Sequence, residues 1–290
     1  MYLAHGANTE WSRFHAHPDV WLVIILISAG YLAALRFWGP KRVSLDEPIV
    51  STKQKVLFFS GVAMLWFGAD WPMHELSEDY LFSMHMVQHT LFSLVAPPLL
   101  LMGTPKWLLR AIIGGPKAMK VARLITRPAV GLVLFNVVIV VTHWPYLVDL
   151  SLTSEPAHFL MHLVLFTSAA LMWWPVVDPL PELSRLSPPG KMLYLFLQSI
   201  VPTVPASFLT FSDGVIYKFY ETVPRLWGID ALTDQRMAGL MMKIGGGLLL
   251  WLAITYLFFK WHAAEERQDV EEVSWEDFER DLQMWELRRG

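Results

Sequence analysis

The chain has 290 residues, of which 54% are hydrophobic and 17% are charged, and its formal net charge is −3. It contains no cysteine, so disulfides, thiolate metal sites, iron–sulfur clusters, covalent haem attachment and cysteine nucleophiles are excluded. The charge balance gives no indication of a nucleic-acid partner. The apolar residues fall in blocks of about 20 separated by short polar stretches, which is typical of a polytopic helical membrane protein.

Seven apolar blocks predict the fold class, an all-α polytopic membrane bundle with seven transmembrane helices. Each block is about long enough to cross a hydrocarbon core of ~30 Å. The expected spans are Pro18–Trp38, Lys53–Trp71, Leu81–Met102, Pro128–Leu147, Pro156–Val177, Lys191–Phe211 and Arg236–Phe259. Two prolines, Pro97 and Pro98, fall inside the third span and are expected to kink it or to end it towards Gly103.

The loops between these spans alternate in charge. Residues 103–127 contain six basic residues and no acidic one, whereas the connection between the second and third spans contains Glu75, Glu78 and Asp79 and no base. The connection between the fourth and fifth spans is also acidic. Because basic loops stay in the cytoplasm, this pattern predicts an outer N-terminus and a cytoplasmic C-terminus.

The segments outside the spans complete the expected domain organisation. It consists of an outer N-terminal tail (1–17) without the apolar region of a signal peptide, a membrane domain (18–261) and an acidic cytoplasmic tail (262–290). In this last tail, Ser274 and Asp277 resemble the two ends of a helix-capping box. The apolar residues that follow at helical spacing are Phe278, Leu282 and Trp285. A short amphipathic helix is therefore expected, which either packs on the basic loops of the chain or docks a partner.

Two histidine pairs with the same spacing lie in the predicted spans. His85 and His89 open the third span, and His158 and His162 open the fifth. Residues four apart lie on one face of a helix, so the two imidazoles of each pair share a face. At 1.5 Å rise per residue, the members of a pair are only ~6 Å apart along the helix axis. Each pair is therefore expected to lie at a single depth, and the two pairs are expected to converge.

Further potential ligands lie at the same predicted depth, at the outer ends of other spans. They are Asp70 and His74 at the end of the second span, His143 at the end of the fourth, and Met237 and Met241, one turn apart, at the start of the seventh. Ionisable residues within spans are costly and mark functional sites by default. Six histidines from different spans in one layer therefore predict a common site.

The chemistry of these side chains leaves a metal ion and a haem as the main alternatives. Imidazole suits zinc, copper, iron and nickel, whereas thioether sulfur selects Cu(I). The methionines that favour copper on this ground are Met161, Met237 and Met241. The side chains expected to orient a ligating imidazole through its second nitrogen are Asp70, Gln88 and Asp234. The outer-tail histidines His5, His15 and His17 are not expected to bind the metal.

A haem held by one histidine from each of two facing helices would use the same residues, although the single depth of the pairs suits one compact site better. A proton or cation transporter is a third alternative. For a metal site, binding is expected to weaken as the pH falls through roughly 6.5, because protonated histidine cannot ligate a metal.

The motifs around these histidines resemble a known family. His85-Met-Val-Gln-His89 followed by Ala96-Pro-Pro-Leu-Leu-Leu-Met-Gly103-Thr-Pro105 resembles the signature of the CtaG-type cytochrome c oxidase assembly factors. Further similarities are His143-Trp-Pro145, His158 with His162, Trp173-Trp-Pro175, and Asp234-Gln235 with Gly239. The resemblance covers roughly residues 21–260 and includes the seven-span topology, while the acidic tail lies outside it. It implies a role in making active haem–copper oxidase, through the handling of copper on the outer side.

The residues and the resemblance together predict a multi-pass assembly factor of the bacterial inner membrane that binds or delivers copper and contacts cytochrome c oxidase subunits. It is not expected to be an enzyme, because the sequence offers no nucleophile–base constellation. The expected metal-binding residues are His85, His89, His158, His162, His143, His74, Asp70, Met237 and Met241. A haem-binding membrane electron-transfer protein is the alternative function.

Overall fold

The computed structural model describes residues 12–44, 46–183, 185–272 and 275–288. These ranges form helices joined by short loops and contain no β-strand. The longer helices are α2 (Pro18–Ala33), α3 (Thr52–Ala69), α5 (Phe82–Thr90), α6 (Ala96–Gly103), α7 (Lys106–Ile113), α8 (Pro116–Ile125), α9 (Pro128–Thr142), α10 (Pro145–Thr153), α11 (Glu155–Val177), α12 (Pro188–Ile200), α13 (Thr203–Phe211), α15 (Ala231–Leu240), α16 (Gly246–Glu272) and α17 (Trp275–Leu287). Shorter helices are α4 (Met73–Glu75) and α14 (Phe219–Thr222).

Several of these helices run on from one to the next to form the membrane spans. Five segments of the described chain are long and apolar enough to cross a membrane by themselves, namely Pro18–Lys41, Phe82–Gly103, Glu155–Val177, Pro188–Phe211 and Ala231–Arg267. Two more are bent pairs, Thr52–Ala69 with Met73–Tyr80 at 51° and Pro116–Ile125 with Pro128–Thr142 at 64°. Counting each pair as one span gives seven, in the predicted order. The all-α membrane bundle is confirmed, whereas the orientation across the membrane stays a prediction.

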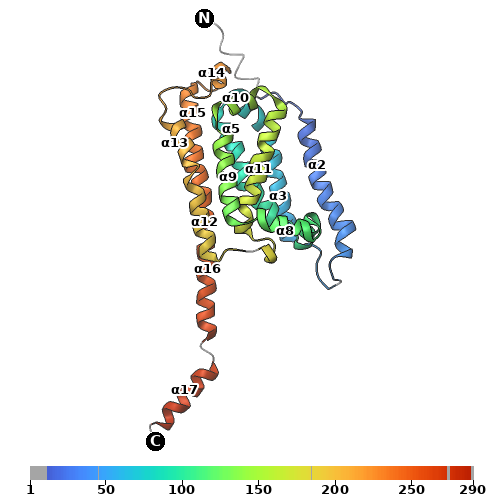
Figure 1. Ribbon diagram of the computed structural model, residues 1–290, viewed down its shortest axis with the longest axis vertical. Helices are drawn as coiled ribbons and strands as arrows, with labels where there is room; N and C mark the ends of the chain where they lie inside the picture. The colour runs from blue at the N-terminus through green and yellow to red at the C-terminus, as the bar shows by residue number, and fades with distance from the viewer. Residues whose placement is uncertain (1–11, 45, 184, 273–274, 289–290) are drawn as a thin grey trace.

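The helices stand side by side in a bundle whose two ends differ (Figure 1). Helix α2 lies at one edge beside α3, and the α12–α13 and α15–α16 segments lie at the opposite edge. Helices α10 and α14 cross one end, which we call the histidine end because the histidine pairs lie towards it. Helix α8 lies at the other end, which we call the basic end, and α16 extends beyond the bundle there towards α17.

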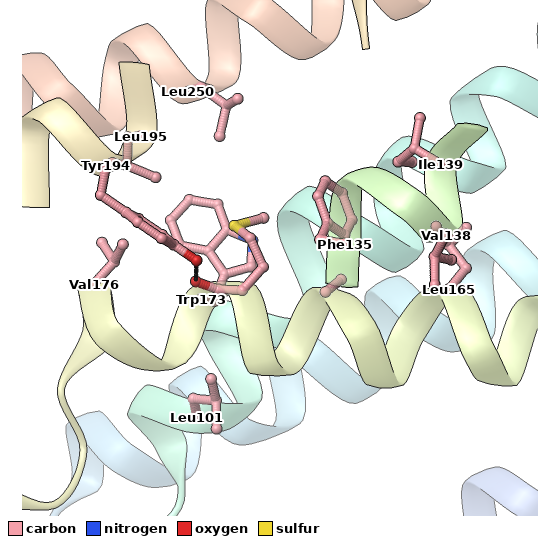
Figure 2. Packing of buried hydrophobic residues seen from close by; sticks show 12 residues of the cluster. Leu101, Phe135, Val138, Ile139, Leu165, Trp173, Val176, Tyr194, Leu195 and Leu250 are labelled. Carbon is pink, nitrogen blue, oxygen red and sulfur yellow. Dashed lines mark hydrogen bonds between the residues drawn. The ribbon is translucent and has the colours of Figure 1, made fainter. Parts of the chain in front are cut away.

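The largest apolar cluster lies where five helices meet (Figure 2). It brings together side chains from α6, α9, α11, α12 and α16, such as Leu101, Phe135 and Leu250. The polar tips of its aromatic residues are paired, since Trp173 donates its indole N–H to the carbonyl of Ser93 at 3.0 Å and Tyr194 donates its hydroxyl to the carbonyl of Met172, also at 3.0 Å. Buried aromatic residues of this kind fix the rotation of α11, which carries one histidine pair, against the third span.

The third span follows a helical path with an irregular centre. Between α5 and α6, residues Leu91–Val95 form a π-helical stretch, and Pro97 and Pro98 fall in the first turn of α6. Proline is tolerated there because the first turn of a helix has no partner for its N–H groups. The span ends at Gly103, where the sequence predicted an end. The hydroxyl of Tyr31 in α2 donates a hydrogen bond to the carbonyl of Gly103 at 3.0 Å. This bond holds the end of the third span against α2.

Gly103 also allows a close approach between α6 and α3, because a Cβ atom there would meet the backbone nitrogen and Cα of Phe58. We expect Gly103→Ala to destabilise the protein by about 1–3 kcal/mol, the typical cost of overpacking. Thermal unfolding in detergent would detect this as a lower midpoint. The matched control is Gly30→Ala in α2, where no atom lies within 4 Å of the added methyl group. Equal midpoints for the two variants would contradict the close-packing role of Gly103.

Two helix ends differ from the predicted spans. The fourth span was expected to reach Leu147, but α9 ends at Thr142, because Trp144 is extended and Pro145 begins the separate helix α10. At the other end of the chain, α16 continues without a break beyond His262 as far as Glu272. The expected helix of the acidic tail is α17, with Phe278, Leu282 and Trp285 exposed, while Ser274 of the predicted capping box lies outside the described residues.

At the basic end, α7 and the connection after α11 are joined by an ion pair. Arg110 donates two hydrogen bonds to the carboxylate of Glu182, at 2.7 and 3.1 Å, and this guanidinium lowers the pKa of Glu182 to about 2. The stabilisation from this pair is present at neutral pH and is lost as the pH falls from the usual range of glutamate through about 2. Because both side chains are partly exposed, the contribution is small.

Candidate metal centre

The two histidine pairs face each other across the contact between α5 and α11. The ring centres of His89 and His162 are 5.1 Å apart, and those of His85 and His162 are 5.8 Å apart. Within each helix the rings are equally close, at 4.3 Å for His85 and His89 and 4.2 Å for His158 and His162. The i,i+4 spacing therefore places both imidazoles of a pair on the face that meets the other helix.

A carboxylate that the sequence analysis did not include completes this group. Glu78 lies in the π-helical stretch Leu76–Tyr80, just before α5, and it faces one imidazole from each pair. Its two oxygens lie 3.5 Å from Nδ1 of His85 and 3.1 Å from Nδ1 of His158. We call His85, His89, His158, His162 and Glu78 the inner cluster. The sequence signal for Glu78 was its place in an acidic, base-free connection directly before the histidine-bearing span, which served only to predict orientation.

The inner cluster contains two groups of potential ligand atoms that share His162. One atom from each of His85, His89 and His162 lies within 4.8 Å of the others, and the same holds for Glu78, His158 and His162. Imidazole nitrogens and a carboxylate oxygen at such separations suit zinc or copper. The arrangement can therefore hold one cation or two close together, with His162 common to both positions.

Several polar atoms of the cluster have no hydrogen-bond partner among the described residues. They are Nδ1 and Nε2 of His89 and Nε2 of His162, while Nδ1 of His85 and Nδ1 of His158 face the Glu78 carboxylate at the distances given above. Leaving a buried polar atom unpaired costs free energy, so such atoms in a folded protein call for an explanation. A bound cation explains them together, because a neutral imidazole nitrogen and a carboxylate oxygen each offer it a lone pair. The residues present therefore fit a metal ion.

His143 and His74 extend the inner cluster in two directions. The ring of His143 lies 5.8 Å from that of His89, and its Nδ1 is 2.7 Å from the carbonyl oxygen of Ile139, which leaves the buried Nε2 for a further partner. The ring of His74 lies 6.2 Å from that of His158, on the other side. All six histidines predicted to share a layer therefore form one continuous group of neighbouring rings.

Asp234 holds the helix that carries the first pair. Its carboxylate accepts hydrogen bonds from the backbone N–H groups of Phe82 and Ser83, at 2.7 and 3.0 Å, at the start of α5. This is helix capping by a residue distant in the sequence, and a carboxylate is also favourable at the positive end of the helix dipole. Gln88 donates its amide to the carbonyl of Gly68 at 2.8 Å. Both residues position α5, whereas the sequence analysis expected them to orient imidazoles directly.

Asp70, predicted as a metal ligand, is engaged in hydrogen bonds, and its metal-binding role stays a prediction. Its Oδ2 accepts hydrogen bonds from the indole N–H groups of Trp21 and Trp66, at 2.8 and 2.6 Å, and its Oδ1 accepts the backbone N–H of Trp71. These bonds fasten α2 to the end of α3. The carboxylate is thus engaged by Trp21, by Trp66 one helical turn before it, and by the backbone of the neighbouring Trp71, and it is not part of the inner cluster.

The two methionines predicted as ligands in the seventh span differ in their surroundings. Met241 packs against the apolar cluster that contains Phe82, Met86 and Leu209, and Met237, one turn earlier, is half-buried. The thioether contribution expected from the sequence stays a prediction. The face that Met241 shares with its neighbours serves apolar packing between the third and seventh spans.

A small cavity of about 60 Å³ adjoins His89 and His143. Its lining includes Lys243, a basic residue inside the seventh span that was not among the predicted site residues. The ammonium group of Lys243 lies 3.4 Å from the hydroxyl of Ser207 and 5.5 Å from the ring centre of Phe211. The hydroxyl and the aromatic face lower the cost of a cation at this depth.

These features define a class of protein, a polytopic helical membrane protein with a buried group of imidazoles and a carboxylate suited to a metal ion. The chain belongs to the family described as cytochrome c oxidase caa3 assembly factor (Caa3_CtaG), whose match extends over residues 29–264. No curated protein and no solved structure matches the chain. The resemblance read from the motifs is confirmed, and the protein is an oxidase assembly factor of a membrane, a role that the family implies to be non-catalytic.

Proposed function

We propose that the protein binds copper in the inner cluster and delivers it to a cytochrome c oxidase subunit during assembly. The observation that carries this proposal is the convergence of His85, His89 and His162, with one ligand atom of each within 4.8 Å of the others. Cu(I) accepts imidazole ligands at low coordination number, and these are the ligands the cluster offers in excess. The family supplies the recipient, because a haem–copper oxidase needs copper to become active.

A haem is a poorer fit to the same residues. Two axial imidazoles must stand on opposite faces of a flat macrocycle, whereas here four imidazoles crowd together, with the ring centres of neighbouring rings 4.2–6.1 Å apart. The adjoining cavity of about 60 Å³ is far smaller than the ~300–1,000 Å³ typical of sites that enclose organic ligands. The geometry therefore favours a bare cation over the haem alternative.

The ligand set also suits delivery of the ion to a partner. Imidazoles and one carboxylate can be exchanged one at a time, in contrast to a closed cage of four thiolates, and surplus histidines allow the ion to shift between the two groups that share His162. Transfer of this kind changes no covalent bond and needs no turnover, in agreement with a non-enzymatic assembly factor. We further propose that the histidine end faces the outer side of a bacterial inner membrane, as the charges of the loops predict.

The test is a Cu(I) titration of the protein purified in detergent, followed by X-ray absorption at the copper edge. We expect one or two copper ions per chain with nitrogen and oxygen ligands, and no sulfur in the first coordination sphere, because the donor atoms grouped in the inner cluster are imidazole nitrogens and carboxylate oxygens. A visible spectrum of the same preparation checks the alternative. A Soret band that replaces copper would overturn the proposal, and a sulfur-rich copper site would assign the metal to other residues.

A further inference from the structure

A second group of metal-ligating side chains lies outside the inner cluster, towards the N-terminal side of α2. Nε2 of His17 is 2.9 Å from Oε1 of Glu75, and Nδ1 of His15 is 3.6 Å from the same oxygen. The ring of His74 stacks edge-on against that of His17, with the ring centres 4.6 Å apart. We call these four residues the outer cluster. Two of its members belong to the tail that the sequence analysis set aside.

The carboxylate of this cluster is placed as a buried ligand. The Glu75 side chain is only 6% exposed, and its Oε2 is buried with no hydrogen-bond partner among the described residues. A buried carboxylate is costly unless its charge is paired, and the groups that face it are the imidazoles of His15 and His17. A cation held between them would neutralise the charge and engage the second oxygen.

The outer cluster lies between solvent and the inner cluster. Side-chain exposure falls from 58% at His15 to 20% at His17, and to 14% at His158 and 6% at His85. His74 is the member of the outer cluster nearest the inner cluster. Its ring contacts that of His17 on one side, and its ring centre lies 6.2 Å from that of His158 on the other. Neighbouring imidazoles and carboxylates therefore run without a break from solvent to the buried inner cluster.

We propose that the outer cluster is a second metal-binding site, which captures the cation from solvent and passes it through His74 to His158 and Glu78 of the inner cluster. This inference rests on the proposed function, since the path would have no purpose without a metal in the inner cluster. Each transfer exchanges one imidazole or carboxylate ligand for the next, with no change in oxidation state. The connection between the second and third spans carries three acidic residues, Glu75, Glu78 and Asp79. Their negative charge attracts a cation to the start of the transfer path.

Direct binding to the outer cluster can be tested after the inner cluster has been disabled. In the variant His89→Ala/His162→Ala, we expect one Cu(II) ion per chain, detected by electron paramagnetic resonance with hyperfine splitting from imidazole nitrogen. Cu(II) is the suitable probe, because imidazole and carboxylate together favour it. Adding His17→Gln to this variant should abolish the signal, whereas adding His262→Gln at the basic end should leave it unchanged. A signal that survives His17→Gln would overturn the second site.

The transfer role is tested separately, by the rate at which the intact protein takes Cu(I) from a coloured chelator. We expect His17→Gln and His74→Gln to slow this loading by about tenfold or more, the scale on which supporting residues affect metal sites, with the final copper content of the inner cluster unchanged. A matched control is Trp21→Phe, which removes a hydrogen bond to Asp70 that anchors α2 but keeps every imidazole. Equal slowing by Trp21→Phe would mean that His17 merely tethers the tail, and normal loading of His17→Gln would overturn the path.

These outcomes are distinct from a failure of the proposed function. If the wild-type protein takes up no copper in the inner cluster, the proposed function fails at the first titration, before any outer variant is compared. If the wild-type protein loads copper normally and the outer-cluster variants load it equally fast, the proposed function stands. The outer cluster is then a structural contact.

Discussion

Replacing His162 by alanine is expected to abolish copper binding in the inner cluster. His162 belongs to both groups of close ligand atoms, so its loss leaves each group with only two donors. Its ring centre lies 5.1 Å from that of His89 and 5.8 Å from that of His85. The other imidazole of α11, His158, has its ring centre 6.1 Å from that of His85. We expect the affinity for Cu(I) to fall by more than about 100-fold, beyond the 10–100-fold typical of residues that only orient a ligand.

The same variant is expected to leave cells with little active caa3-type oxidase, although its helices still assemble. His162 is an interior side chain with an unpaired nitrogen, so alanine removes a costly polar atom along with some packing. Oxidase activity and copper content of membranes, measured beside the amount of the variant protein, separate loss of function from loss of the protein. His262→Ala is the matched control, because His262 is exposed at the opposite end, where its neighbours are Glu266, at 3.4 Å, and the ring of Phe258. Wild-type oxidase levels in the His162→Ala strain would leave the histidines as structural residues.

Much of this fold could be predicted from the sequence, because apolar block length is a direct consequence of membrane thickness. The third span was expected at Leu81–Met102 and lies at Phe82–Gly103, and the sixth was expected to end at Phe211 and does. The fourth span was drawn too long, to Leu147. Large aromatic and apolar side chains continue through Tyr146 and Leu147, but Pro145 starts a new helix there, and helix ends depend on local backbone geometry more than on side-chain type.

The site was only partly predictable, for a related reason. The i,i+4 spacing fixes which imidazoles share a face, so both histidine pairs could be found without a structure. Glu78 stands seven residues before His85, but their contact does not follow from helical spacing, because Leu81 is extended and breaks the helix between them. The partners of Asp70 were equally hidden, since Trp21 approaches it from a different span through packing that one sequence does not encode locally. The histidines of the outer tail were not expected to bind the metal, because nothing in the tail sequence predicts the contact of His17 with Glu75.

The largest effect at a single non-histidine residue is expected for Glu78→Gln. Glutamine has the same shape as glutamate and keeps a carbonyl oxygen, so the variant changes the charge at this position and little else. Glu78 is the one carboxylate of the inner cluster, and its two oxygens reach one imidazole of each helix, at 3.5 and 3.1 Å. A cation bound among neutral imidazoles gains from a buried negative charge at this distance, because the surrounding dielectric screens it weakly.

We therefore expect Glu78→Gln to weaken Cu(I) binding by about 10–100-fold, whether the carboxylate ligates the ion or orients the imidazoles that do. Competition with a chelator of known affinity measures this change. The matched control is Asp79→Asn, which removes a charge from the next residue, whose side chain is exposed and lies outside the inner cluster. If the two variants weaken binding equally, Glu78 acts only through the general field of the acidic connection. If Glu78→Gln binds copper as tightly as the wild type, the carboxylate is no part of the metal site and the imidazoles alone hold the ion.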